Sequence, residues 1–226
     1  MSQTTSQTWR KLLATPGTTA QYKFKIGDTW YDKTEEVSSK AESMLYSDFG
    51  IGNVSTAHLE LQVFSESEIP RAATIERWVQ LVNGNDRSEW LQKGVFFTST
   101  REEEDGWWKL SAYDAMRKAQ KVWEPSQDLT FPMSMPSAVA LIAADMGVEL
   151  DSRTELLEEY TVDYPANDIT EANVLAYIAA AHGGNWIITD PGKLFLVPLA
   201  SLPGTTNYLV DEESNYIVFG GVRILV

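Results

Sequence analysis

The residues of this chain whose types could support chemistry are few, and their spacing does not bring them together. The densest carboxylate cluster is the run Glu102–Asp105. Adjacent residues of a hairpin point to opposite faces, so this run does not converge on one reacting atom or one Ca²⁺ ion. We interpret it as a solvated hairpin tip. Asp163 and Asp168 flank Pro165 and could pair two carboxylates, but no general-acid pattern surrounds them.

The histidines, serines and glycines give no stronger signal. The only histidines are His58 and His182, and cysteine is absent, which excludes a histidine-rich metal site, disulfides, thiolate catalysis and cysteine-ligated zinc. His182 is expected at a helix C-terminus, where a partly charged imidazole is favourable, so a capping role is preferred to catalysis. His58 is expected at the surface or at a barrel rim. No serine has an evident base, and the Gly-x-Gly at 50–52 lacks the third glycine of a dinucleotide fingerprint.

We therefore predict no catalytic, cofactor-binding or metal-binding residues, no cofactor, and a protein that is not an enzyme. The composition limits the remaining classes. The 226 residues are 43% hydrophobic, which is typical of a globular chain with one or two domains. The net charge of −14 argues against a DNA-binding face that neutralises phosphates. The small basic group of Arg117, Lys118 and Lys121 is interpreted as a solvated helix face.

Targeting and membrane signals are also missing from the pattern. The sequence has no apolar run of transmembrane length, so no membrane-spanning segment is expected. The polar Ser/Thr/Gln-rich N-terminus lacks the basic-then-apolar order of a signal peptide, and no Sec export is expected. Residues 1–20 are interpreted as an N-terminal arm, with Trp9, Leu12 and Leu13 as possible anchors on a partner or on the body.

The elements that would position any site change in kind along the chain. The first half alternates with period two and turn signals, which predicts about six strands in a small antiparallel barrel or sandwich. The expected strands are Tyr22–Ile26, Thr29–Tyr31, Leu59–Phe64, Thr74–Val82, Trp90–Thr100 and Trp107–Ala112. Residues 32–43 are expected to be a loop or an exposed strand. The surplus tryptophans fall in these strands and are expected to pack a core or an interface.

At Ser111 the period changes from strand to helix, with Ser111 as the expected N-cap. A second helix follows Ser134, and its buried face is predicted to hold Val139, Ile142 and Met146 before Gly147 ends it. A third helix, Glu171–His182, is expected to be capped by Thr170. The rest of the expected elements are a possible strand at 160–164, a hairpin formed by 185–189 and 193–198, and final strands at 208–210 and 216–226.

These elements predict the fold class α+β, with an antiparallel β-barrel domain and an inserted small α+β domain. The predicted domains are the arm at 1–20, the barrel formed by 21–110 together with 205–226, and the inserted domain at 111–204. The insertion is inferred because the strand before Ser111 runs directly into a helix, while the final apolar strand has no partner in the α+β segment.

The order of several segments resembles the baseplate hub (tail-tip hub) proteins of tailed phages and related prophages. The resemblance covers about residues 22–200, and no one motif is diagnostic. The segments that carry it are Phe49–Asn53 with Leu59–Val63, Trp90–Phe96, Leu110–Met116, Phe131-Pro132, Ala144–Val148 and Ile169–Ala179 followed by Gly183–Asn185.

The resemblance implies a structural protein of the phage tail tip, assembled in the host cytoplasm and located in the virion. It implies a hub ring, a homotrimer, that joins the tail tube to the tip or baseplate and forms part of the DNA conduit. The implied partners are further copies of the chain, distal tail or tail tube proteins, and tail fibre or spike proteins, with DNA only as passing cargo. An acidic or neutral lumen is then expected, with Glu60, Gln62 and Glu76 as wall candidates.

Two alternatives come from other classes of protein. One is a carbohydrate-binding adhesion module of a tail or cell-surface assembly, and the other is an accessory module of a peptidoglycan hydrolase. The first rests on the eight tryptophans, whose rings could stack on sugars.

Overall fold

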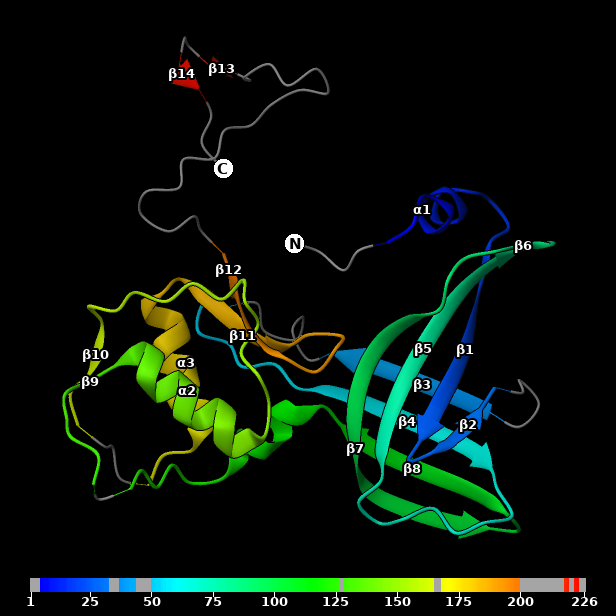
Figure 1. Ribbon diagram of the computed structural model, residues 1–226, viewed down its shortest axis with the longest axis horizontal. Coiled ribbons are helices and arrows are strands. Elements are labelled where there is room, and N and C mark those ends of the chain that lie inside the picture. Colours follow the sequence, from blue (N-terminus) through cyan, green and yellow to red (C-terminus); the bar gives the residue numbers. More distant parts are fainter. Residues whose placement is uncertain are drawn as a thin grey trace.

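A curled antiparallel sheet and a smaller helical module lie beside each other along the long axis of the molecule (Figure 1). The computed structural model describes residues 5–32, 37–43, 50–126, 128–164 and 168–199, together with the backbone of 218–219 and 222–223. The sheet and the module each have their own buried hydrophobic cluster. We use the name helical module for residues 115–199.

The sheet has eight strands in the order β2-β1-β5-β7-β8-β4-β3, with β6 paired to β5. All pairings are antiparallel. The strands are β1 (Thr19–Ile26), β2 (Thr29–Tyr31), β3 (Val37–Ser43), β4 (Ala57–Phe64), β5 (Thr74–Asn83), β6 (Asp86–Arg87), β7 (Leu91–Glu104) and β8 (Trp107–Tyr113). Of the two alternatives left open for residues 32–43, the exposed strand is therefore confirmed for 37–43.

The curl of the sheet brings its inner face around one core. Phe24, Leu59 and Ile75, from three different strands, are fully buried in the same cluster. The described strands do not close into a barrel, because β2 and β3 are the two open ends of the strand order. The strands described thus form a curled half-barrel, and the predicted completion of the barrel by residues 205–226 lies mostly outside the described residues.

The longest hairpin of the sheet follows the alternation that its sequence shows. In β8, Trp108, Leu110 and Ala112 are buried while the residues between them are partly or fully exposed, as expected for a strand that covers a core on one face. Asp105 and Gly106 both have positive φ, 53° and 79°, and make the tight turn that joins β7 to β8. Residues 102–104, expected in the hairpin loop, belong to β7 instead.

A short helix at each end of the sheet segment differs from the expected pattern. Within the expected arm lies α1 (Gln7–Leu13), whose Trp9 and Leu12 pack against the sheet beside Leu91. The helix expected after Ser111 is the 3-10 helix η2 (Ala115–Gln120), and its N-cap is Asp114, not Ser111. Ser111 remains in β8, because the strand continues to Tyr113 in register with β4.

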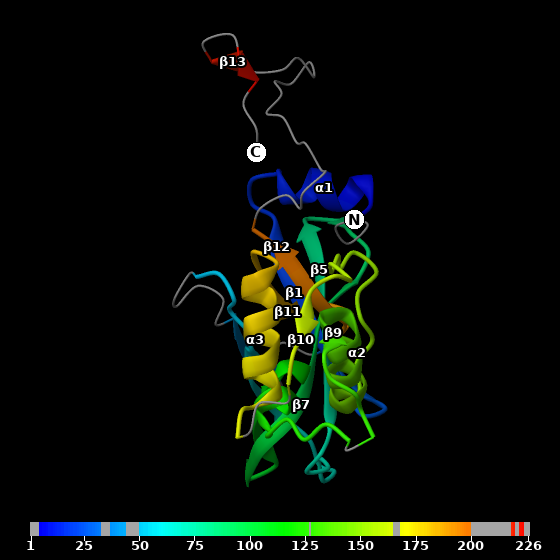
Figure 2. The same cartoon turned by 90° about the vertical axis from the view of Figure 1, so that its left-hand side faces the viewer.

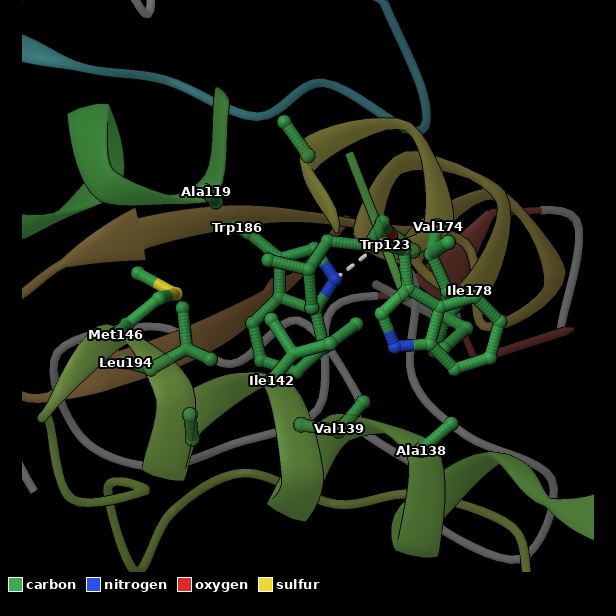
Figure 3. Packing of buried hydrophobic residues seen from close by; sticks show 14 of the residues in the cluster. Ala119, Trp123, Ala138, Val139, Ile142, Met146, Val174, Ile178, Trp186 and Leu194 are labelled. Carbon is green, nitrogen blue, oxygen red and sulfur yellow. Dashed lines mark hydrogen bonds between the residues drawn. The ribbon is translucent and has the colours of Figure 1, made fainter. Parts of the chain in front are cut away.

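The helical module packs two helices and two small two-stranded sheets around Trp186 (Figure 3). Its helices are α2 (Met135–Met146) and α3 (Glu171–Ala181), capped by Ser134 and Thr170, and Gly147 ends α2 in the left-handed conformation as predicted. The expected apolar face of Val139, Ile142 and Met146 is fully buried. One sheet pairs β9 (Met133–Ser134) with β10 (Thr161–Val162), and the other is the hairpin of β11 (Gly184–Ile188) and β12 (Leu194–Pro198).

A short segment before β4 joins the two halves of the molecule. The Gly52 amide donates to the Gly184 carbonyl at 2.9 Å, and the Asn53 amide donates to the Asn185 side chain at 2.7 Å. The Trp186 amide donates to the Asn53 carbonyl at 2.8 Å, and Val54 packs against the cluster of the helical module. Residues 52–54, which lie between two strands of the sheet in sequence, thus extend the β11–β12 hairpin in space.

The C-terminal part of the chain is described only as two short strands, β13 (Val218–Phe219) and β14 (Val222–Arg223), which pair with each other. The rest of the final strands expected at 208–210 and 216–226 lies outside the described residues. The α+β class is confirmed. The division into a barrel with an inserted domain, and the return of 205–226 to the barrel, remain predictions.

Candidate interaction surface

Three tryptophans gather around one lysine on the outer face of the sheet, the face turned away from the core. Trp30 of β2, Trp78 of β5 and Trp90, just before β7, form this tryptophan cluster, and Lys23 of β1 lies among them. The Lys23 Nζ atom is 4.2 Å from the ring centre of Trp30, 5.8 Å from that of Trp78 and 4.6 Å from that of Trp90. Cross-strand pairing creates the cluster, because Lys23 lies opposite Trp78.

The cluster keeps part of its aromatic surface open to solvent. Trp30 is 43% exposed, and its ring meets that of Trp78 edge to face at 6.1 Å. The Trp78 indole N–H donates to the Glu76 carboxylate at 3.1 Å, which fixes the ring on the sheet. Tryptophan is enriched at the hot spots of protein interfaces, and a cation can lie against its ring. This cluster is therefore a candidate protein-binding surface. Trp78 and Trp90 were expected in a core or an interface, but their meeting with Trp30 around Lys23 was not predicted.

A shallow polar groove of about 400 Å³ runs over β3, β4, β7 and β8 on the outer face. It contains Glu60 and Gln62, two of the expected lumen residues, together with Lys40 and Lys109. Lys40 pairs with Glu42 at 2.5 Å, and Lys109 lies 3.6 Å from Glu104. The groove therefore presents charges of both signs, most of them on exposed side chains.

At this groove the structure brings together a serine and a histidine that the sequence left unpaired. His58 Nε2 and Ser111 Oγ are 2.8 Å apart, and the imidazole stacks on Tyr113 with ring centres 4.6 Å apart. Among the described residues no hydrogen bond is made to His58 Nδ1, so no third group orients the imidazole as a catalytic triad requires. The expectation that no serine has a base is wrong in geometry, although this pair lacks the remaining parts of a nucleophile site.

His182 occupies the helix end where a cap was expected, but in its neutral form. It is the buried C-cap residue of α3, its Nδ1 atom is 2.8 Å from the Ile178 carbonyl, and its Nε2 atom accepts from the Leu157 amide at 2.9 Å. An imidazole that accepts at one nitrogen and donates at the other is uncharged. The capping role is confirmed, whereas the partial charge proposed for it is wrong.

The basic group of Arg117, Lys118 and Lys121 is exposed, as predicted for a solvated face, and its side chains also contact the rest of the protein. The Lys118 ammonium lies 3.8 Å from the ring centre of Phe97 and donates to the Met146 carbonyl at 3.1 Å. Arg117 stacks on Tyr113, and Lys121 pairs with Asp145. These contacts tie η2 to both the sheet and α2, so this group offers no free basic patch for nucleic acid.

A buried carboxyl links η2, α2 and α3. Glu171 is only 2% exposed, and its Oε2 atom has no hydrogen-bond partner among the described residues. Burial, together with a hydrogen bond to Asp145, raises the pKa of Glu171 to about 8, against the opposing effect of Lys121 at 3.9 Å. The Asp114 carboxyl, buried beside the start of β4, has its pKa raised to about 6 by burial. Both groups lie between packed elements rather than in a cleft.

The carboxylates considered from sequence remain dispersed. Residues 102–105 are exposed along and beyond the end of β7, and the Asp163 carboxylate accepts a 2.9 Å hydrogen bond from the Thr161 hydroxyl. Within the described ranges, no group of three or more His, Asp or Glu side chains is arranged to hold a metal ion. No described helix is both long enough and apolar enough to cross a bilayer.

The fold is similar to that of two tail proteins, one of them from a prophage. The 43 kDa tail protein of prophage MuSo2 from Shewanella oneidensis matches 81% of this chain and 56% of its own, with a TM-score of 0.52 and 12% identity. The tail protein from Neisseria meningitidis MC58 matches 87% of this chain and 58% of its own, with a TM-score of 0.51 and 12% identity. The chain thus spans a little over half the length of these proteins. No family model and no curated protein matches the sequence.

Proposed function

We propose that the protein is a structural component of a phage tail. The observation that carries this proposal is the shared fold, which extends over four fifths or more of the chain and includes both the curled sheet and the helical module. Both of these neighbours are tail proteins.

Within the tail, we propose a hub ring at the tip, formed by three copies, that joins the tail tube to the tip or baseplate. The sheet edges at β2 and β3, which have no further strand partner among the described residues, and the exposed tryptophan cluster support self-association, because unpaired edges and rigid surface aromatics are typical of protein interfaces. Tail tube proteins and tail fibre or spike proteins are the further partners. The location is the virion, at the tail tip.

The proposed ring is part of the DNA conduit, with DNA only as passing cargo. The net charge of −14 supports a wall that repels phosphates rather than retaining them. Glu60, Gln62 and Glu76 all lie on the outer face, where they would be available to a lumen. Lys40 and Lys109 share the groove with Glu60, so the conduit proposal requires that these lysines stay paired with Glu42 and Glu104.

The role is structural, and we propose that the protein is not an enzyme. The His58–Ser111 pair has no orienting carboxylate within hydrogen-bond distance among the described residues. The carbohydrate-binding alternative has support only from the exposed ring of Trp30. Lys23 lies over the rings of Trp30 and Trp90, where a sugar would have to stack. A shift of tryptophan fluorescence on adding bacterial wall polysaccharide would favour that alternative.

Electron microscopy of the phage particle, with a gold-labelled antibody against this chain, tests the proposal. We expect label at the tail tip, and an end-on projection of the isolated hub with a central opening. Absence of label from the tail would overturn the structural role. Label on the tail combined with a solid particle, or with an opening ringed by Lys and Arg, would overturn the conduit alone.

A further inference from the structure

The helical module has an apolar pocket of about 250 Å³ that the proposed function does not use. Trp123, Val174 and Ile178 line it from within, and all of them are buried in the module core (Figure 3). Pockets for small-molecule ligands are about 300–1,000 Å³, so this one is better matched to one or two apolar side chains of a protein partner. We call it the tyrosine pocket, after the residues at its rim.

The rim is aromatic, exposed and acidic. Tyr177 of α3 is 67% exposed and Tyr164 is 70% exposed, which places them among the most exposed large apolar side chains in the described residues. Asp163 also lines the pocket and is exposed. The neighbouring segment adds exposed Glu158 and Glu159. The surface therefore favours an occupant with an apolar anchor next to positive charge.

The chain itself carries a segment with this chemistry. In α1, Trp9 and Leu12 face the sheet, which leaves Leu13 70% exposed at the end of the helix. Arg10 and Lys11 are exposed in the same last turn. Their side chains supply the two basic groups that would flank a leucine anchor.

A single copy does not bring these two surfaces together. In Figure 1, α1 lies at one side of the view and the β9–β10 side of the helical module lies at the other. Figure 2 shows α1 above α3 and β12, away from the β9–β10 side of the helical module. A contact between them therefore joins different patches of two copies, and such heterologous contacts generate rings when their rotation closes.

We propose that the end of α1 from one copy docks into the tyrosine pocket of the next copy. Leu13 fills the apolar pocket between Tyr164 and Tyr177, and Arg10 and Lys11 lie over the acidic rim at Asp163. The proposal rests on the self-association proposed above and assigns the residues that carry it. It buries the exposed leucine of one copy and the exposed tyrosine rings of the other in the same contact.

Sedimentation velocity on the full chain over a concentration series tests the contact. Leu13→Asp and Tyr177→Asp should each raise the dissociation constant of self-association by about tenfold or more, as expected for a central anchor. Leu141→Asp, which changes an exposed leucine of α2, is the matched control and should leave it unchanged. Circular dichroism of each variant checks that the fold is retained.

A charge exchange makes the test specific to the two patches. Arg10→Glu combined with Lys11→Glu should weaken self-association, and adding Asp163→Lys should restore part of it. A wild-type chain that stays monomeric overturns the contact, and so does an oligomer that Leu13→Asp leaves intact. Loss of assembly in Tyr177→Asp but not in Leu13→Asp assigns the pocket to a different occupant and also overturns it. Antibody label at the tail tip remains the separate test of the proposed function.

Discussion

Glu171 makes the stability of the helical module depend on pH in an unusual direction. Its pKa is raised from 4.5 to about 8 in the folded protein, so the folded state holds a proton that the unfolded state releases. Its contribution to stability is therefore complete below pH 4.5 and is lost as the pH rises toward 8. Glu171→Gln, which keeps the shape without the charge, should raise the free energy of unfolding at pH 8 by about 1–2 kcal/mol and have little effect at pH 4.5.

Urea unfolding of the wild type and of Glu171→Gln between pH 4.5 and pH 8 measures this effect. The matched control is Glu149→Gln, because Glu149 is exposed and Lys193 lowers its pKa instead. If the free energy of unfolding changed with pH in the same way for the wild type and for Glu171→Gln, Glu171 would not hold a proton in the folded protein.

Gly52 is required where the segment before β4 meets α3. Its φ is +82°, and a Cβ atom there would lie 3.0 Å from both the Ala176 carbonyl oxygen and the Ala180 Cβ. Gly52→Ala should therefore lower the free energy of unfolding by about 2–4 kcal/mol, because strain in φ adds to the clash. Gly84 also has a positive φ, but no atom lies within 4 Å of where its Cβ would be. Gly84→Ala should therefore lower the free energy of unfolding by only about 1–2 kcal/mol. If thermal denaturation showed equal losses of stability for Gly52→Ala and Gly84→Ala, the close approach of residue 52 to α3 would be contradicted.

At the scale of elements, Trp186 connects α3, β11 and the segment before β4. Its side chain is fully buried, its indole N–H donates to the Leu175 carbonyl at 2.8 Å, and its backbone amide donates to Asn53. Trp186→Ala should lower the free energy of unfolding by about 3–5 kcal/mol, and Trp186→Phe by less, since the ring volume is partly kept. Trp30→Phe, on the exposed cluster, should change it by less than about 0.5 kcal/mol. Chemical denaturation measures these free energies. A smaller loss for Trp186→Ala than for Trp30→Phe would show that Trp186 is not central to the fold.

The elements also show what the sequence could and could not predict. The period-two pattern of β8 and the caps at Thr170 and Gly147 are local, and each was predicted correctly. Asp114, whose carboxylate accepts from the Met116 amide at 3.0 Å, was missed as the cap because β8 continues to Tyr113 through its pairing with β4, which is distant in sequence. The tryptophan cluster depends on strand order, and the tyrosine pocket on how α3 meets β10. Neither the strand order nor the packing of α3 against β10 can be read from the periodicity of neighbouring residues in the sequence.

At the scale of the whole molecule, the predicted insertion gives a direct experiment. If residues 205–226 return to the sheet domain, deleting 208–226 should lower the melting temperature of the β-rich part and leave the Trp186 core folded. Hydrogen exchange resolved along the chain would measure both parts in one sample. Unchanged protection of β1, β5 and β7 in the truncated chain would reject the insertion.

The contact between residues 52–55 and β11 has a consequence for how the chain folds during synthesis. Asn53 and Asn185, which bond at 2.7 Å, are 132 residues apart in sequence. The ribosome therefore releases the whole sheet segment before the strand that completes this contact exists. Contacts of such high sequence separation slow folding, because a long loop must close before they form. We expect the half-barrel to fold in two stages. Residues 52–55 reach their final position only after β11 has been synthesised and has bound to them.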